Sequence, residues 1–256
     1  MKKCKSLILA AYSVLALSLS ANAQSSFNLK TVYKDENVTF RELNDSTWLG
    51  SGNVMSSESM YLIEGKDKAV LTHVHPDHAG AVGCFDEVWI GPGDTVNISR
   101  DMPDYKGEVK YLRNRDIIDL GGRSLEVYFT PGHTPGSVTF LEKGTEYGYC
   151  GDSFGTGQGF KNAGILIFCE DLGTIINTCS ESYRYFRDNG YRKLYCGHFY
   201  GDNFVIEERI RFVEEAVTRL KNGELEVSPY EGVFNLNRKA VYNGYKMRFV
   251  GSAEQP

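Results

Sequence analysis

The fold is decided by the stretch Thr72-His73-Val74-His75-Pro76-Asp77-His78, which follows a short apolar strand. Four side chains with metal-binding atoms stand within six residues at the end of that strand. Residues two apart on a strand point to the same side, so His73 and His75 are expected to hold one metal together. A turn helped by Pro76 directs Asp77 and His78 toward a second metal. Imidazole and carboxylate ligands in this combination suit zinc.

This stretch resembles the His-x-His-x-Asp-His signature of the metallo-β-lactamase fold superfamily. Three later segments resemble the remaining motifs of the superfamily in the same order: Thr130-Pro131-Gly132-His133-Thr134-Pro135-Gly136-Ser137, Cys150-Gly151-Asp152-Ser153 and Cys196-Gly197-His198. The resemblance runs from about Val38 to the end of the sequence. It implies an α/β fold, the αββα sandwich, with the metals at one edge.

The resemblance also implies a set of seven ligands that uses all five histidines of the chain. The first metal takes His73, His75 and His133, and the second takes Asp77, His78 and His198, with Asp152 bridging both. Histidine rather than glutamate at position 75 favours a zinc hydrolase over the diiron redox branch of the superfamily. Two Zn²⁺ ions per chain are therefore expected, with iron or manganese as the alternative.

Two adjacent zinc ions give a defined chemistry. Held about 3.5–4 Å apart, they share a water, lower its pKa toward neutrality and present the bridging hydroxide to a carbonyl. Asp77 is the expected catalytic residue, because it can orient the hydroxide and shuttle its proton. Tyr200 follows the last ligand and is a candidate for binding a substrate oxygen; the alternative is an ordinary aromatic residue at the rim.

The sequence starts with features of an export signal. Lys2, Lys3 and Lys5 precede an apolar run over residues 7–19, and Ala21-Asn22-Ala23 has the small-x-small pattern of a signal-peptidase site. The run is too short to serve as a membrane anchor. We therefore expect a signal peptide over residues 1–23 and one hydrolase domain over residues 24–256, exported to the periplasm or secreted, with no stable membrane anchor.

The remaining pattern predicts many strands and two long helices. Apolar residues at three- and four-residue steps predict helices over 172–186, with Asp171 as N-cap, and over 206–220, ended by Gly223. The expected strands are 37–43, 46–51, 59–65, 69–72, 87–90, 109–112, 117–120, 124–130, 137–141, 147–150 and 193–196, with a final hairpin over 239–250.

One departure from the superfamily precedes the first histidines. Relatives place an Asp-x-Gly turn, a helix and another strand before the His-x-His segment, whereas Tyr61–Leu71 here runs directly into Thr72. A parallel neighbour needs a crossover of a dozen or more residues. Either Ala69–Thr72 pairs antiparallel with Ser59–Gly65, or the sheet lacks a strand and has an open edge. An apolar sheet face is then exposed or covered by a second subunit, which makes a homodimer the hypothesis.

The ligand set favours an active hydrolase of a small ester, thioester, lactone or lactam. The alternative is a non-catalytic or degenerate metal-binding relative that lost its crossover. A net charge of −5 gives no basic surface for nucleic acid, so a small-molecule substrate is the expected partner. A true glyoxalase II is disfavoured, because that family takes glutathione contacts from a helical C-terminal domain. The region after His198 predicts only one helix and a hairpin.

Overall fold

The structure, a computed structural model, describes residues 30–34, 38–44, 47–52, 59–63, 68–80, 82–155, 164–198, 204–232 and 234–251. The expected signal peptide and Tyr200 lie outside this part. None of the helices in the described ranges is both long and apolar enough to span a bilayer.

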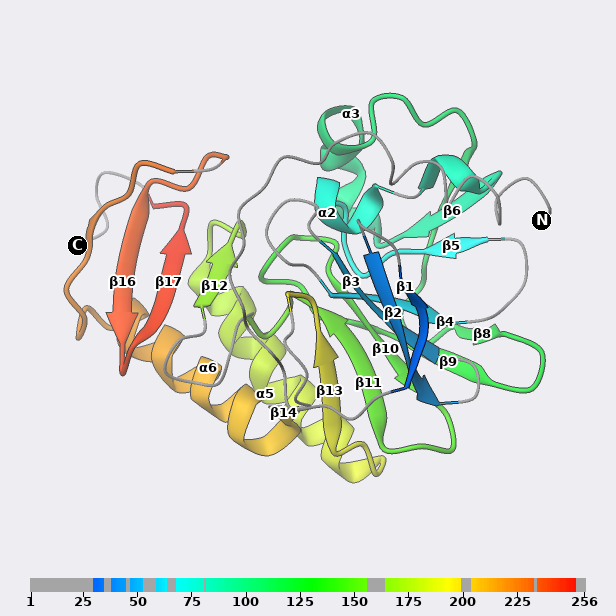
Figure 1. Ribbon diagram of the computed structural model, residues 1–256. Helices are drawn as coiled ribbons and strands as arrows, with labels where there is room; N and C mark the ends of the chain where they lie inside the picture. Colours follow the sequence, from blue (N-terminus) through cyan, green and yellow to red (C-terminus); the bar gives the residue numbers. More distant parts are fainter. Residues whose placement is uncertain are drawn as a thin grey trace.

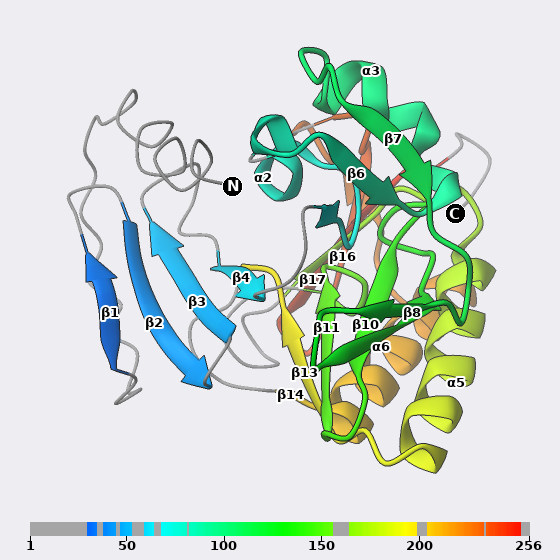
Figure 2. The same cartoon turned by 90° about the vertical axis from the view of Figure 1, so that its right-hand side faces the viewer.

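Two sheets come from the first half of the chain. The N-terminal sheet is antiparallel, in the order β1-β2-β3-β4, and Figure 2 shows β1, β2 and β3 beside the rest of the chain. Its strands are β1 (Thr31–Lys34), β2 (Val38–Asn44), β3 (Thr47–Gly52) and β4 (Ser59–Ile63). The second sheet is parallel, in the order β5-β6-β7. Its strands are β5 (Ala69–Val70), β6 (Glu87–Ile90) and β7 (Glu108–Tyr111).

Two further sheets carry the second half. A six-stranded sheet has the order β14-β13-β11-β10-β9-β8, and within it β11 and β13 are parallel. Its strands are β8 (Ile117–Asp119), β9 (Ser124–Phe129), β10 (Val138–Glu142), β11 (Tyr147–Gly151), β13 (Lys193–Cys196) and β14 (Phe204–Val205). A four-stranded sheet has the order β12-β17-β16-β15. Its strands are β12 (Gly164–Ile167), β15 (Ser228–Pro229), β16 (Arg238–Tyr242) and β17 (Tyr245–Phe249).

The helices form at the places where the sequence provides starts and stops. The two long ones are α5 (Leu172–Asp188) and α6 (Ile206–Lys221), and the short ones are α2 (Pro76–Ala79) and α3 (Ile98–Asp101), with 3₁₀ turns η1 (Val82–Cys84) and η2 (Pro92–Asn97). Asp171 caps α5 by accepting the Gly173 N–H at 2.9 Å, as predicted. Past the end of α6, Gly223 has a φ of +72°, a conformation that glycine adopts without strain.

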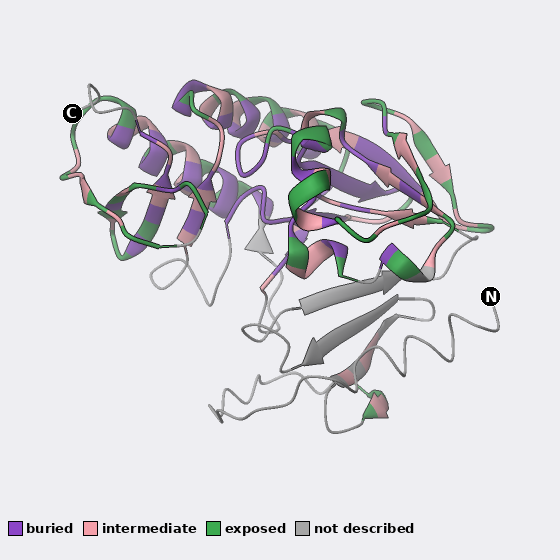
Figure 3. Ribbon diagram, turned by 90° about the horizontal axis from the view of Figure 1, so that it is seen from above, coloured by how far each residue is buried: buried purple, intermediate pink, exposed green. Residues whose placement is uncertain are grey.

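Three apolar cores separate four layers of secondary structure (Figures 1 and 3). The first core lies between the helix pair α5–α6 and the six- and four-stranded sheets. The second joins the six-stranded sheet to the β5-β6-β7 sheet, and the third joins that sheet to α2 and α3. Successive strand residues face opposite cores: Phe140 faces the second and Leu141 the first. This is the αββα sandwich, so the predicted fold class is confirmed.

The observed pairing of β5, the strand before the histidines, excludes one of the two alternatives considered for it. The antiparallel pairing of 69–72 with 59–65 is wrong, because β5 pairs with β6 in parallel, Ala69 opposite Val88 and Val70 opposite Trp89. The physical reason is side-chain burial: Leu71 packs in the third core and Val70 against the second, which only a strand between both layers achieves. Among the described strands β5 lies at a sheet edge, in agreement with the other alternative.

Candidate metal centre

Seven potential ligands stand at the ends of strands along one edge of the sandwich. His73 and His75 follow β5, and Asp77 and His78 lie in the one-turn helix α2 that Pro76 starts. The others are in the β9–β10 connection (His133), directly after β11 (Asp152) and shortly after β13 (His198). Because β11 and β13 run in parallel, their carboxyl ends bring the last two residues to the same edge.

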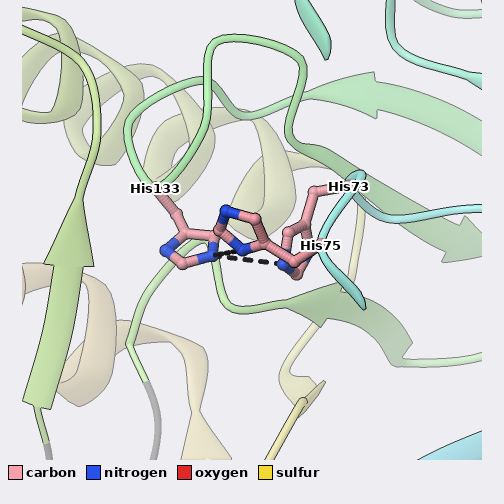
Figure 4. A group of neighbouring side chains, drawn as sticks. All are labelled: His73, His75 and His133. Carbon is pink, nitrogen blue, oxygen red and sulfur yellow. Dashed lines mark hydrogen bonds between the residues drawn. The ribbon is translucent and has the colours of Figure 1, made fainter. Parts of the chain in front are cut away.

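Three imidazoles converge on one point. His133 Nε2 lies 3.1 Å from His73 Nε2 and 3.1 Å from His75 Nδ1, and all three residues are buried (Figure 4). His133 Nδ1 is 2.7 Å from the Leu166 carbonyl oxygen in β12. A carbonyl only accepts, so Nδ1 carries the proton of the neutral ring and Nε2 presents a lone pair to the other two rings.

A second group of side chains adjoins the first. His198 Nε2 is 3.0 Å from Asp77 Oδ2 and 3.3 Å from Asp152 Oδ2. The two oxygens of Asp152 face different histidines: Oδ1 is 3.6 Å from His78 Nε2, and Oδ2 is 3.7 Å from His133 Nε2. Asp152 therefore lies between the two groups.

Burial and mutual charge set the protonation of the cluster. Burial lowers the pKa of His75 to about 3 and holds the pKa of His73 well below its ordinary value. Burial raises the pKa of Asp152, but the charges of His78 and His198 outweigh it, and the net pKa is far below the usual range. Two neutral imidazoles and an ionised carboxylate are the forms in which these residues bind metals.

The residues fit a pair of divalent cations. Within the described part of the chain, His78 Nε2 and Asp152 Oδ1 are buried and have no hydrogen-bond partner. Three groups could hold an ion, with potential ligand atoms within 4.8 Å of one another: His73, His75 and His133; His73, His78 and Asp152; Asp77, His78 and His198. Together these groups contain all seven residues singled out in the sequence.

Asp94 is a residue of the centre's surroundings that the sequence reasoning missed. It is fully buried in η2, where Oδ2 accepts the Val74 N–H at 2.7 Å and the Thr134 hydroxyl at 3.0 Å. Oδ1 accepts the Gly136 N–H at 2.9 Å and the Asn97 side-chain amide at 3.3 Å. Burial raises the pKa of Asp94, and the hydrogen bonds offset part of that effect. One carboxylate thus joins the His73–His75 segment to the loop that carries His133.

Close backbone approach requires glycine beside two of the side chains. A Cβ on Gly197 would contact Asp152 Oδ1 and would lie 2.6 Å from His78 Cε1. Gly151 has a φ of +51°, and a Cβ there would lie 2.7 Å from Thr72 Cβ.

Three further buried residues lie within two positions of Asp152 or His198 in the sequence. Cys150 and Cys196 are buried thiols, and burial raises the pKa of each. Ser153, which follows Asp152, is buried with its Oγ 2.8 Å from Thr130 Oγ1, just before the His133 loop. Tyr200 lies outside the described residues, so its role stays a prediction.

The chain is similar in sequence to one known protein family and to several of its members. The family described as the Metallo-beta-lactamase superfamily matches residues 60–198, more than half of the chain. A hydroxyacylglutathione hydrolase of Hyphomonas neptunium is 27% identical over 188 residues, which cover 62% of this chain and 66% of that protein. The corresponding protein of Prochlorococcus marinus is 26% identical over 178 residues, 61% of this chain and 64% of that one. The chain spans slightly less than two thirds of the length of both relatives.

A solved structure shows the same fold. A metallo-beta-lactamase from Pontibacter korlensis superposes with a TM-score of 0.55, covering 71% of this chain and 99% of that chain at 13% identity. At this identity the similarity concerns the fold alone.

Proposed function

Because this chain belongs to the metallo-beta-lactamase superfamily, we propose that it is a dinuclear zinc hydrolase acting on a small ester, thioester, lactone or lactam. The observation that carries the proposal is the convergence of five imidazoles and two carboxylates from four separate segments. Nitrogen-rich sites completed by carboxylate oxygen are typical of zinc. Iron and manganese are the competing metals.

The ligand roles follow the two groups of side chains. We assign the first zinc to His73, His75 and His133, and the second to Asp77, His78 and His198. Asp152 would serve both ions, since its Oδ1 faces His78 of the second set and its Oδ2 faces His133 of the first.

The chain's own residues prepare the site for hydrolysis. Zinc, when bound, supplies a water of lowered pKa and polarises the substrate's carbonyl oxygen. Burial raises the pKa of Asp77, but the hydrogen bond from His198 and the charge of His78 outweigh it, so the carboxylate is ionised at neutral pH. An ionised Asp77 accepts a hydrogen bond from the attacking water, orients it and takes up its proton.

Among the four proposed substrate classes, we favour thioesters. Support comes from the relatives named hydroxyacylglutathione hydrolase, whose similarity covers 62% and 61% of this chain. Beyond the centre the described chain has one long helix, α6, and the short strands β14 to β17. We therefore do not extend the proposal to recognition of the glutathione part.

Metal analysis and a substrate screen test the proposal together. We expect two zinc ions per correctly folded chain, and turnover of at least one of an acyl-glutathione thioester, a homoserine lactone, nitrocefin and a phosphodiester. His133→Ala should lose tightly bound metal and activity. The matched control Asp119→Asn, which changes an exposed carboxylate at the end of β8, should keep both. Fewer than one metal per folded chain would instead favour the non-catalytic relative.

Export is a separate proposal, supported by the basic, apolar and small-residue segments at the start of the sequence. N-terminal sequencing of protein from the periplasm or medium should begin near Gln24. Recovery of the uncleaved chain from the cytoplasm would contradict export and would leave the hydrolase proposal untouched.

A further inference from the structure

Two phenylalanines lie against the histidines assigned to the first zinc. Phe168 follows β12, and its ring centroid is 4.9 Å from that of His75 and 5.5 Å from that of His133. Phe234 lies between β15 and β16 and stacks on His75, with centroids 5.3 Å apart and an interplanar angle of 14°. The two phenylalanines meet edge to face at 5.5 Å. We call Phe168 and Phe234 the aromatic wall.

The conformation and exposure of Phe234 are unusual for a core residue. Its φ is +59°, a region in which a bulky side chain is strained. Its side chain is nevertheless 46% exposed, so the strain is not offset by full burial. Residues held in sparsely populated backbone conformations cluster at ligand-binding and active sites, where the surroundings fix them. This combination indicates that the ring is held beside the centre for contact with a ligand.

The charge near the wall is already balanced. The Arg100 guanidinium lies 5.1 Å from the centroid of the Phe234 ring. It donates two hydrogen bonds to the Asp101 carboxylate, at 2.7 and 2.6 Å, and one to Asn97 Oδ1. Because Asp101 neutralises this cation, Arg100 does not offer a free positive charge for a substrate carboxylate beside the wall.

From these observations we propose that the aromatic wall is a substrate subsite that selects a flat apolar group, such as an aryl group, next to the scissile bond. The inference rests on the proposed hydrolase function and narrows its substrate class. Phe234 lies beyond residues 60–198, the part matched by the superfamily, so this selectivity is a property of the chain's own C-terminal region.

The test uses binding, so that its outcome is separate from catalysis. The zinc-loaded protein is titrated calorimetrically with phenylmethanethiol and with ethanethiol, two thiols that ligate zinc and differ in the aryl group. We expect the aryl thiol to bind on the order of tenfold more tightly, the scale of one good aromatic contact. Phe234→Gly removes the ring and relieves the backbone strain, and it should bring the ratio of affinities close to one. Phe234→Tyr should restore it.

A structural role predicts a different result. If Phe234 only shields His75, Phe234→Gly weakens zinc binding in a chelator competition and lowers both thiol affinities equally, leaving their ratio unchanged. That result would overturn the subsite, as would an equal affinity of the wild-type protein for both thiols. Ile117→Ala, which truncates an exposed apolar residue on β8, is the matched control and should leave the ratio unchanged. If the protein binds the aryl thiol more tightly but hydrolyses no substrate, the hydrolase proposal fails, whereas the proposal that Phe168 and Phe234 bind an aryl group is supported.

Discussion

Asp94→Asn is the perturbation for which the structure gives the most specific expectation. The amide nitrogen must replace one of the two carboxylate oxygens, each of which accepts two hydrogen bonds. Placed at Oδ1, it meets the donors of Gly136 and Asn97. Placed at Oδ2, it meets the Val74 N–H and the Thr134 hydroxyl, and the hydroxyl can rotate to accept. The second orientation is better, and it leaves the Val74 N–H without a partner.

The magnitude follows from that one buried donor. An unsatisfied buried N–H costs about 1–3 kcal/mol, a considerable part of the roughly 5–15 kcal/mol by which a domain is stable. Val74 stands between His73 and His75, so the loss falls on the segment that carries two ligands. Residues that orient ligands typically contribute about 10–100-fold to metal affinity. We expect Asp94→Asn to lower both stability and zinc affinity by amounts in these ranges.

Urea unfolding of the metal-free protein measures the first effect, and competition with a chromophoric chelator measures the second. Asp119→Asn is the control, because this exposed carboxylate also accepts a backbone N–H, that of Gly121 at 2.8 Å. It should change the free energy of unfolding by no more than about 0.5 kcal/mol. If Asp94→Asn binds zinc and unfolds as the wild type does, the carboxylate does not hold the ligand segments together.

Four further expectations can be checked directly. Gly197→Ala places a methyl group against Asp152 and His78, so the number of zinc ions per chain measured by metal analysis should fall from two toward one. An unchanged number would contradict the requirement for glycine at position 197. Burial lowers the pKa of His198, but hydrogen bonds and charge from Asp152 and Asp77 raise it to about 11. If His198 is a ligand as proposed, zinc must displace this proton, so calorimetry in buffers of different ionisation enthalpy should detect proton release, and affinity should rise with pH between 6 and 9. Removal of zinc with a chelator should lower the melting temperature, because ligands that bind only the folded state stabilise it; an unchanged midpoint would count against a buried metal centre. Light scattering coupled to size-exclusion chromatography should give the mass of a homodimer, and the mass of a stable monomer would contradict the homodimer hypothesis.

The sequence predicted the cluster of seven candidate ligands because each of these residues lies in a short motif at a strand end. His73 and His75 share a strand face, and the later segments agree with the superfamily in residue type, order and spacing. The structure brings all seven residues together. The layers were predictable for a related reason: two amphipathic helices and many short strands leave few ways to bury their apolar faces.

What the sequence did not reveal depends on contacts between distant segments. Asp94 stands in Gly91-Pro92-Gly93-Asp94, which has the composition of an ordinary turn. The backbone N–H groups that donate to its carboxylate belong to Val74 and Gly136, which are 20 and 42 residues away in the sequence. The Gly-Pro-Gly pattern was the only local signal that backbone would pack closely there. The pairing of β5 was ambiguous for the same reason, since a two-residue strand carries no register information of its own. β12, an apolar run of four residues, was also missed.

The bond from His133 to Leu166 has a consequence for the order in which the molecule matures. β12 contains Leu166 and lies at the edge of its sheet, where β17 is its one neighbouring strand among those described. The acceptor that fixes the tautomer of His133 is therefore held by residues 246–249, which stand more than a hundred positions after His133 in the sequence. Residues 246–249 must therefore leave the ribosome before this imidazole takes its final orientation, so a cation that uses His133 as a ligand would load only after β17 has been made.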